Sequence, residues 1–185
     1  MGWLDTLLGR SKPVQPNLDA LFALPSAAVT LQAATGLVPT GLGSVSFRAA
    51  EGGAFATLER DVQDLLGDRV DKSSDQYGYT WLLVRRSPDD VSDLVTELHA
   101  VNSSLEGAGF GPSLLCSLVS FADADGRRMA VVYLYKRGTF YPFAPLSGQH
   151  RDNALELQAR GALEGELPLE QDLGRWFPVW GAPGL

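Results

Sequence analysis

The stretch YLYKRGTFYPFAP, residues 133–145, sets five aromatic rings around one basic pair and guides the prediction of the fold. Apolar residues run through 129–136, as is typical of a strand, and Gly138 then predicts a break or a bulge. Extended structure resumes at 140–143. Pro142 confines that piece to the edge of a sheet or to a loop, because proline has no N–H to donate to a neighbouring strand.

Two hairpins are predicted in the chain. Apolar segments at 114–121 and 129–136 bracket residues 123–126, Asp-Ala-Asp-Gly, where Asp and Gly signal a tight turn between antiparallel strands. The other hairpin joins strands at 27–33 and 43–49 through a connection punctuated by glycine and proline.

One more strand and four helices complete the elements predicted for residues 17–185. The strand, 77–84, carries large or apolar residues on both faces and is expected in the centre of the sheet; a charged loop at 68–75 precedes it. The clearest helix has Ser87 as its N-cap and ends at Gly107. Apolar spacing and cap residues place the other three helices at 18–24, which Pro25 ends, at 55–66 and at 151–163.

This order of elements predicts an α+β fold, a mixed or antiparallel sheet with two hairpins and with helices packed against it. Residues 1–16 are expected to form a short helix and a proline-containing linker. Residues 17–185 are expected to form one domain that ends in an irregular aromatic tail, because prolines exclude a regular helix around Trp176 and Trp180.

Composition and charge exclude several classes of protein. The 185 residues include 22 acidic and 15 basic side chains, a formal net charge of −7, whereas a nucleic-acid binder normally presents a basic face to the phosphates. We therefore expect no nucleic-acid partner. Cys116 is the only cysteine, which excludes an intrachain disulfide, and its apolar neighbours predict a buried, inert thiol. The absence of a signal peptide and of a run of about 20 apolar residues predicts a cytoplasmic protein.

Motifs for catalysis and for cofactor binding are absent from the sequence. There is no glycine-rich phosphate loop and no GxSxG nucleophile elbow, so we expect no cofactor. The only histidines are His99, beside the apolar stripe of the 87–107 helix, and His150, in a loop. A hydrolase that uses one of them in a constellation hidden by the sequence stays open as an alternative.

Two sets of residues are candidates for contact with other molecules. Aromatic and basic residues outside regular helices are candidates for a protein partner, because such residues are enriched in the cores of interfaces. They are Lys136, Arg137, Phe140, Tyr141, Phe143, Trp176 and Trp180. A short amphipathic helix at residues 2–9 is a candidate for peripheral membrane contact, with Arg10 and Lys12 facing anionic headgroups. Its apolar residues are Trp3, Leu4, Leu7 and Leu8.

Four stretches together resemble a known family. They are GWLDTLLGRSKP at 2–13, the opening stretch at 133–145, residues 151–157, and RWFPVWG at 175–181. The chain is similar over essentially its full length to PspAB, the PspA-associated protein family of actinobacteria and related prokaryotes. The resemblance carries no catalytic motif. It implies a non-enzymatic accessory or adaptor protein of the phage-shock, or cell-envelope stress, response, which associates with PspA in the cytoplasm or at the inner face of the membrane.

Overall fold

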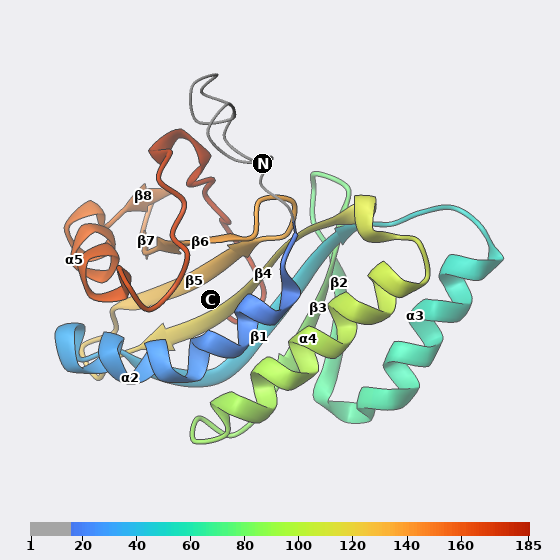
Figure 1. Cartoon of the computed structure of the whole chain (residues 1–185), viewed down its shortest axis with the longest axis horizontal. Helices are drawn as coiled ribbons and strands as arrows, with labels where there is room; N and C mark the ends of the chain where they lie inside the picture. Colours follow the sequence, from blue (N-terminus) through green and yellow to red (C-terminus); the bar gives the residue numbers. More distant parts are fainter. Residues whose placement is uncertain (1–15) are drawn as a thin grey trace, which may run out of the picture.

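The computed structural model describes residues 16–185, which form a six-stranded antiparallel sheet in the order β2-β3-β1-β4-β5-β6 (Figure 1). The strands are β1 (Val38–Arg48), β2 (Val70–Ser74), β3 (Tyr79–Arg85), β4 (Leu114–Ala122), β5 (Arg128–Leu134) and β6 (Thr139–Phe143). A small second sheet pairs β7 (Pro145–Leu146) with β8 (His150–Arg151). The predicted α+β fold with an antiparallel sheet is confirmed.

Four α-helices and four short 3₁₀ segments accompany the two sheets in this part of the chain. The helices are α2 (Leu24–Thr35), α3 (Gly53–Leu66), α4 (Val91–Gly107) and α5 (Asn153–Leu163). The 3₁₀ segments are η1 (Leu18–Ala23), η2 (Gly67–Arg69), η3 (Gly111–Ser113) and η4 (Leu173–Arg175). Helix α4 begins at Val91 rather than after Ser87, because residues 87–90 form a turn in which the Ser87 carbonyl accepts the Asp90 N–H.

The predicted hairpin at 114–136 is confirmed as β4 and β5. Its turn is built by Asp123, whose Oδ1 accepts the backbone N–H groups of Asp125 and Arg127 at 3.0 and 2.9 Å. Gly126 has a φ of 86°, a left-handed conformation that glycine adopts without steric cost. Within the six-stranded sheet, β6 pairs only with β5 and lies at the end of the strand order, so the edge position that Pro142 predicts is confirmed. On its other side, Phe140 forms a single bridge with Leu169.

The other predicted hairpin is wrong, because residues 27–33 lie inside helix α2. Segment η1 continues directly into α2, and Pro25 occupies the first turn of that helix instead of ending the one before it. The helix buries Leu24 and Leu31 in the core. Burying a leucine contributes about 1.5–3 kcal/mol, which exceeds the ~1 kcal/mol span of strand propensities.

Two further strands differ from the prediction. Strand β1 is longer than predicted and pairs with β3 and β4, so it runs through the centre of the sheet. It passes Arg86 at Gly41, where φ is +84° and a Cβ atom would lie 2.1 Å from the Arg86 carbonyl oxygen, so only glycine fits. The charged segment 68–75 contains strand β2, whose exposed residues form the other edge of the sheet.

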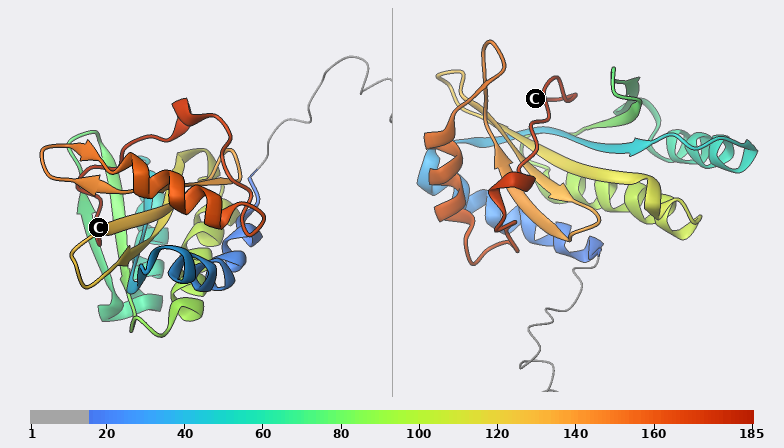
Figure 2. Two further views of the ribbon diagram at one scale, coloured as in Figure 1. Left: turned by 90° about the vertical axis from the view of Figure 1, so that its left-hand side faces the viewer. Right: turned by 90° about the horizontal axis from the view of Figure 1, so that it is seen from above.

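The two faces of the sheet are covered in different ways. Helices α2, α4 and α5 lie on one face, with α3 beside α4, and they share one core with Val45, Phe47 and Val119 of the sheet. The C-terminal tail, residues 176–185, lies on the opposite face (Figure 2). Among the described helices, only the continuous run Leu18–Thr35 is long and apolar enough to cross a membrane, and its Leu21, Leu24 and Leu31 are buried in the domain core.

Candidate functional site

Most of the rings predicted to contact a partner lie in the core instead. Phe140, Tyr141, Phe143 and Trp176 are all buried, so they do not form the exposed contact surface that was expected, although the Tyr141 ring lines the groove described below. The reason is that the edge strand β6 is covered on both faces. Phe140 packs on Tyr133 on the helix side, with ring centroids 5.0 Å apart. Tyr141 and Phe143 face the tail, where Tyr141 stacks on Trp176 at 6.1 Å and Phe143 meets Trp180 edge-on at 4.9 Å.

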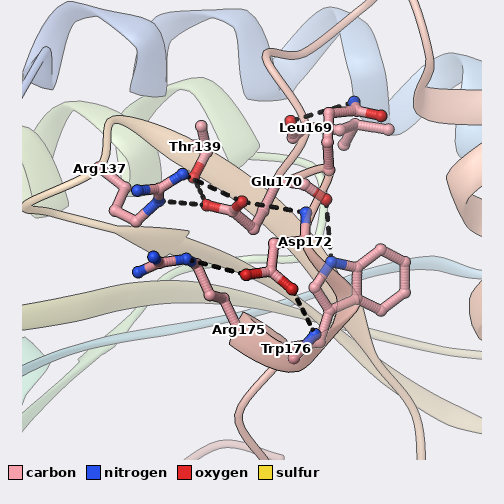
Figure 3. A network of polar contacts seen from close by, with 9 residues as sticks. Arg137, Thr139, Leu169, Glu170, Asp172, Arg175 and Trp176 are labelled. Carbon is pink, nitrogen blue, oxygen red and sulfur yellow. Dashed lines mark hydrogen bonds and ion pairs between the residues drawn. The ribbon is translucent and has the colours of Figure 1, made fainter. Parts of the chain in front are cut away.

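Arg137 is committed to an internal ion pair. Its Nε donates to the Glu170 carboxylate at 2.6 Å, and the Thr139 hydroxyl donates to the same oxygen at 2.9 Å (Figure 3). Glu170 is 2% exposed. Burial raises the pKa of Glu170, but the hydrogen bonds from Arg137, the Asp172 N–H and Thr139 together hold it below the usual value of 4.5. Arg137 therefore has a structural partner within its own chain.

The same network fastens the start of the tail to the edge of the sheet. The Glu170 N–H donates to the Phe140 carbonyl at 2.7 Å, and the Trp176 indole N–H donates to the Glu170 carbonyl at 3.0 Å. Further along, the Tyr141 hydroxyl donates to the Phe177 carbonyl at 2.7 Å. These bonds fasten residues 170–177 to strand β6, and a gap lies between the tail and strand β3.

That gap is a groove of about 430 Å³ on the tail side of the sheet, which we call the aromatic groove. One wall comes from the β2–β3 turn and β3, the floor from β4, β5 and β6, and the other wall from the tail. Its lining consists of Asp75, Tyr77, Tyr79, Trp81, Leu115, Cys116, Leu134, Tyr141, Phe177, Pro178, Val179 and Trp180. Tyr77 and Phe177 are 65% and 57% exposed, so large rings stand free at the rim.

Two small residues, Ser46 and Cys116, lie side by side on the groove face of the sheet, and of these Cys116 lines the groove. Ser46 lies opposite Trp81 on one side and Cys116 on the other, so it shares their face of the sheet. Its side chain is fully buried, and its Oγ has no hydrogen-bond partner among the described residues. The Cys116 thiol is buried as predicted, and burial raises its pKa to about 12, so it stays protonated and acts as floor rather than as a nucleophile.

Asp75 is the single charged residue in this lining. Its Oδ1 accepts the N–H groups of Tyr77 and Tyr79 at 2.8 and 3.0 Å, and its Oδ2 accepts the Trp81 indole N–H at 3.0 Å. Burial raises the pKa of Asp75, but these donors lower it further, to below the usual 3.8. The groove therefore carries a negative charge at neutral pH, and these three N–H donors hold the carboxylate in place.

Of the remaining predicted contact residues, one lines the groove and one lies elsewhere. Trp180 is half-buried and forms part of the tail wall. Lys136 is exposed in the wall of a separate cleft of about 440 Å³, beside Pro16 and Tyr135, whose hydroxyl donates to the Glu106 carboxylate. The candidate membrane residues Trp3, Leu4, Leu7 and Leu8 lie outside the described residues, as does the predicted helix at 2–9.

The two histidines occupy separate elements, and neither lines the aromatic groove. His150 is exposed in strand β8. His99 has Asp19 3.1 Å from its Nε2 and Ser103 3.3 Å from its Nδ1, the three residue types of a catalytic triad but with the two ring nitrogens exchanged, because in a triad the carboxylate bonds Nδ1 and the serine bonds Nε2. However, Ser103 lies within α4, where backbone N–H groups donate along the helix, so they cannot form an oxyanion hole beside the serine. The Asp19 side chain is also 86% exposed.

Metal binding finds no support in residues 16–185, where no group of three or more His, Cys, Asp or Glu side chains is placed to hold an ion. Sequence reasoning identified Tyr141 and Trp180 but missed the β3 wall of the groove, including Asp75. One signal was present, since Asp75 stands before Gln-Tyr-Gly, a turn composition, with large rings at alternate positions after it. The tail forms the other wall, and its position depends on contacts between residues that are far apart in the sequence.

Comparison with known proteins gives one match. A family model described as PspAB, PspA associated protein B, matches residues 1–184. Neither the curated proteins nor the solved structures that were compared show a match to the chain. The match spans nearly all of the sequence and agrees with the resemblance carried by the four stretches at 2–13, 133–145, 151–157 and 175–181. The chain therefore belongs to the PspAB family of PspA-associated proteins.

Proposed function

We propose that this chain is a non-enzymatic adaptor of a PspA-type cell-envelope stress response, and that it binds PspA through the aromatic groove. The family supports an accessory role related to PspA. The observation that carries the proposal is the groove itself, an apolar surface with free rings at its rim, on the sheet face that none of the helices within residues 16–185 covers. Exposed aromatic rings around a preformed apolar depression are typical of the centre of a protein interface.

Charge favours a basic partner surface at this groove. The chain carries a net charge of −7, and Asp75 places a negative charge inside an otherwise apolar lining. Complementary charges increase association rates and select among partners. We therefore expect PspA to offer the groove a segment that combines apolar and basic side chains.

The enzyme alternative has less support than the adaptor. The one triad-like arrangement, around His99, lacks free backbone donors and has a solvent-exposed carboxylate. If the chain is a hydrolase that uses His99 or His150, then replacing each with Ala removes the activity. An adaptor retains PspA binding in both variants.

The test is co-purification of PspA with the tagged full chain from cells under envelope stress, detected with a PspA-specific antibody. Tyr77→Ser with Phe177→Ser removes two exposed rings from the rim, and we expect recovery of PspA to fall at least tenfold. The control, Leu146→Ser with Leu157→Ser, removes two leucines that are about half exposed elsewhere, and should recover PspA like the wild type. Equal recovery by both double variants would contradict a role for the groove, and no PspA from any of them would contradict the adaptor function.

We also propose a cytoplasmic location, with residues 2–9 as a peripheral membrane contact. Flotation with anionic liposomes, comparing the full chain with a chain that lacks residues 1–12, tests the contact. We expect the shortened chain to float less. Equal flotation would exclude the segment.

A further inference from the structure

The aromatic groove has the composition of a site for an organic cation. Three aromatic residues, Tyr77, Tyr79 and Trp81, come from one wall, and Tyr141, Phe177 and Trp180 complete the ring-rich lining. The faces of aromatic rings attract cations, and the attraction grows when the site excludes water. A single carboxylate, Asp75, supplies the opposite charge inside this lining.

The hydrogen bonds of Asp75 leave it able to accept one more donor. Oδ1 already accepts two N–H groups, whereas Oδ2 accepts only the Trp81 indole. A carboxylate oxygen has two lone-pair directions, so Oδ2 keeps one acceptor position. Among the described residues, no Lys, Arg or His lies within ion-pair distance of Asp75, so its charge is not neutralised from within residues 16–185.

Arginine suits this site better than lysine. A guanidinium is planar, is weakly hydrated and stacks on aromatic faces, whereas an ammonium is compact and strongly hydrated. The molecule itself makes this contact on one ring of the lining, where the Arg48 guanidinium carbon lies over Tyr79, 5.1 Å from the ring centroid. Arg151 lies over Phe143 in the same way, at 5.0 Å.

We propose that the aromatic groove binds the guanidinium of one arginine side chain presented by the protein partner, with the plane of the group on the rings and one N–H donated to Asp75 Oδ2. This inference rests on the proposed adaptor function for the source of the arginine. The volume of about 430 Å³ falls within the usual range for small-molecule pockets, and can admit one long side chain with its neighbouring backbone.

The test is an NMR titration of the full chain with the peptide acetyl-Gly-Arg-Gly-amide, following the indole N–H signals of Trp81 and Trp180. The matched probe replaces arginine with citrulline, which has nearly the same shape and no charge. We expect saturable shifts of both indoles with the arginine peptide, and at least tenfold weaker binding of the citrulline peptide. Choline is the third probe, and it represents a lipid headgroup.

Variants locate the binding in the groove. Asp75→Asn removes the charge, and we expect it to weaken arginine binding at least fivefold. Asp61→Asn, at an exposed position of α3, should leave binding unchanged. If Asp75→Asn disturbs the fold, which the same spectra reveal, Tyr77→Leu removes an exposed ring instead and should also weaken binding.

Two outcomes would overturn the inference. Equal binding of the arginine and citrulline peptides would show that charge plays no part, and choline binding as tightly as arginine would assign the site to a headgroup. Both are independent of PspA recovery. If PspA co-purifies but the arginine peptide does not bind, the adaptor function stands and the arginine site is excluded. If the peptide binds but PspA is not recovered, the arginine site stands and the adaptor function is excluded.

Discussion

Two arginines near the tail pair with carboxylates in very different surroundings, and the difference predicts unequal effects on stability. Arg137 neutralises Glu170, which is 2% exposed, whereas Arg175 pairs with Asp172 in solvent (Figure 3). Arg137→Ala leaves a buried carboxylate without its cation, so we expect the free energy of unfolding to fall by about 2–4 kcal/mol. Arg175→Ala should cost under about 1 kcal/mol. Urea denaturation followed by circular dichroism measures both, and equal effects would show that Glu170 does not depend on Arg137.

The lowered pKa of Glu170 gives a pH dependence with a definite sign. A carboxyl whose pKa is lower in the folded state than the usual 4.5 stabilises the fold above pH 4.5, and this contribution is lost as the pH falls through the folded-state value. We expect Glu170→Gln to be less stable than the wild type at pH 7. The difference should shrink below pH 4.5, because a protonated Glu resembles Gln.

The matched control for that measurement is Glu164→Gln, at an exposed position just after α5. Its difference from the wild type should be small and should not change with pH. A Glu170→Gln difference that stays constant down to pH 3 would mean that the carboxylate charge contributes nothing to stability.

Individual residues were predictable where their neighbours in sequence decide their surroundings. The apolar run around Cys116 was enough to predict its burial. Arg137 was expected at a partner surface, because its ion-pair partner Glu170 lies 33 positions away and nothing local indicates the pairing. Asp75 was missed for a related reason, since its role depends on closure of the groove by the tail.

At the scale of elements, the end of the tail offers a matched pair of glycines. Gly181 and Gly184 have φ values of +71° and +86°, so alanine is strained at both positions. A Cβ at position 184 would also lie 2.9 Å from Leu83 Cδ1 and 3.1 Å from Leu42 Cβ, whereas one at position 181 meets nothing within 4 Å. We expect Gly184→Ala to loosen the tail from the sheet and Gly181→Ala to keep it bound.

Cleavage of the tail by carboxypeptidase measures that difference. Gly184→Ala should be shortened several times faster than Gly181→Ala, with a larger change in Trp fluorescence. Equal rates would show that the last residues are not held against Leu42 and Leu83.

Elements were predictable where turn chemistry and periodicity agree. Strands β4 and β5 have both, an Asp-Gly turn and apolar flanks, and were placed correctly. Helix α2 lacks such agreement, because its valine and threonine suit a strand and Pro25 suits either an end or a start. Burial of its leucines against α4 and the sheet favours the helix over a strand, and this tertiary packing cannot be inferred from the local sequence pattern. Strand β2 was missed because it is an edge strand with polar residues on both faces.

At the scale of the whole molecule, the two faces of one sheet have different roles. The helix side holds a continuous core. On the tail side, the ten residues 176–185 cover only part of the sheet, and the aromatic groove remains open beside them. Sequence alone predicted the α+β class and the family, because both depend on patterns along the chain. It could not predict the groove, whose walls come from residues 75–81 and 177–180 and meet only after folding.

The central claim is that PspA binds this chain at the aromatic groove, and hydrogen–deuterium exchange of the purified chain with and without purified PspA tests it most directly. We predict that PspA slows exchange in peptides covering residues 75–81 and 177–180, with little change in α3. Slower exchange confined to the helix side, over α2, α4 and α5, or unchanged exchange in a complex that demonstrably forms, would contradict the claim.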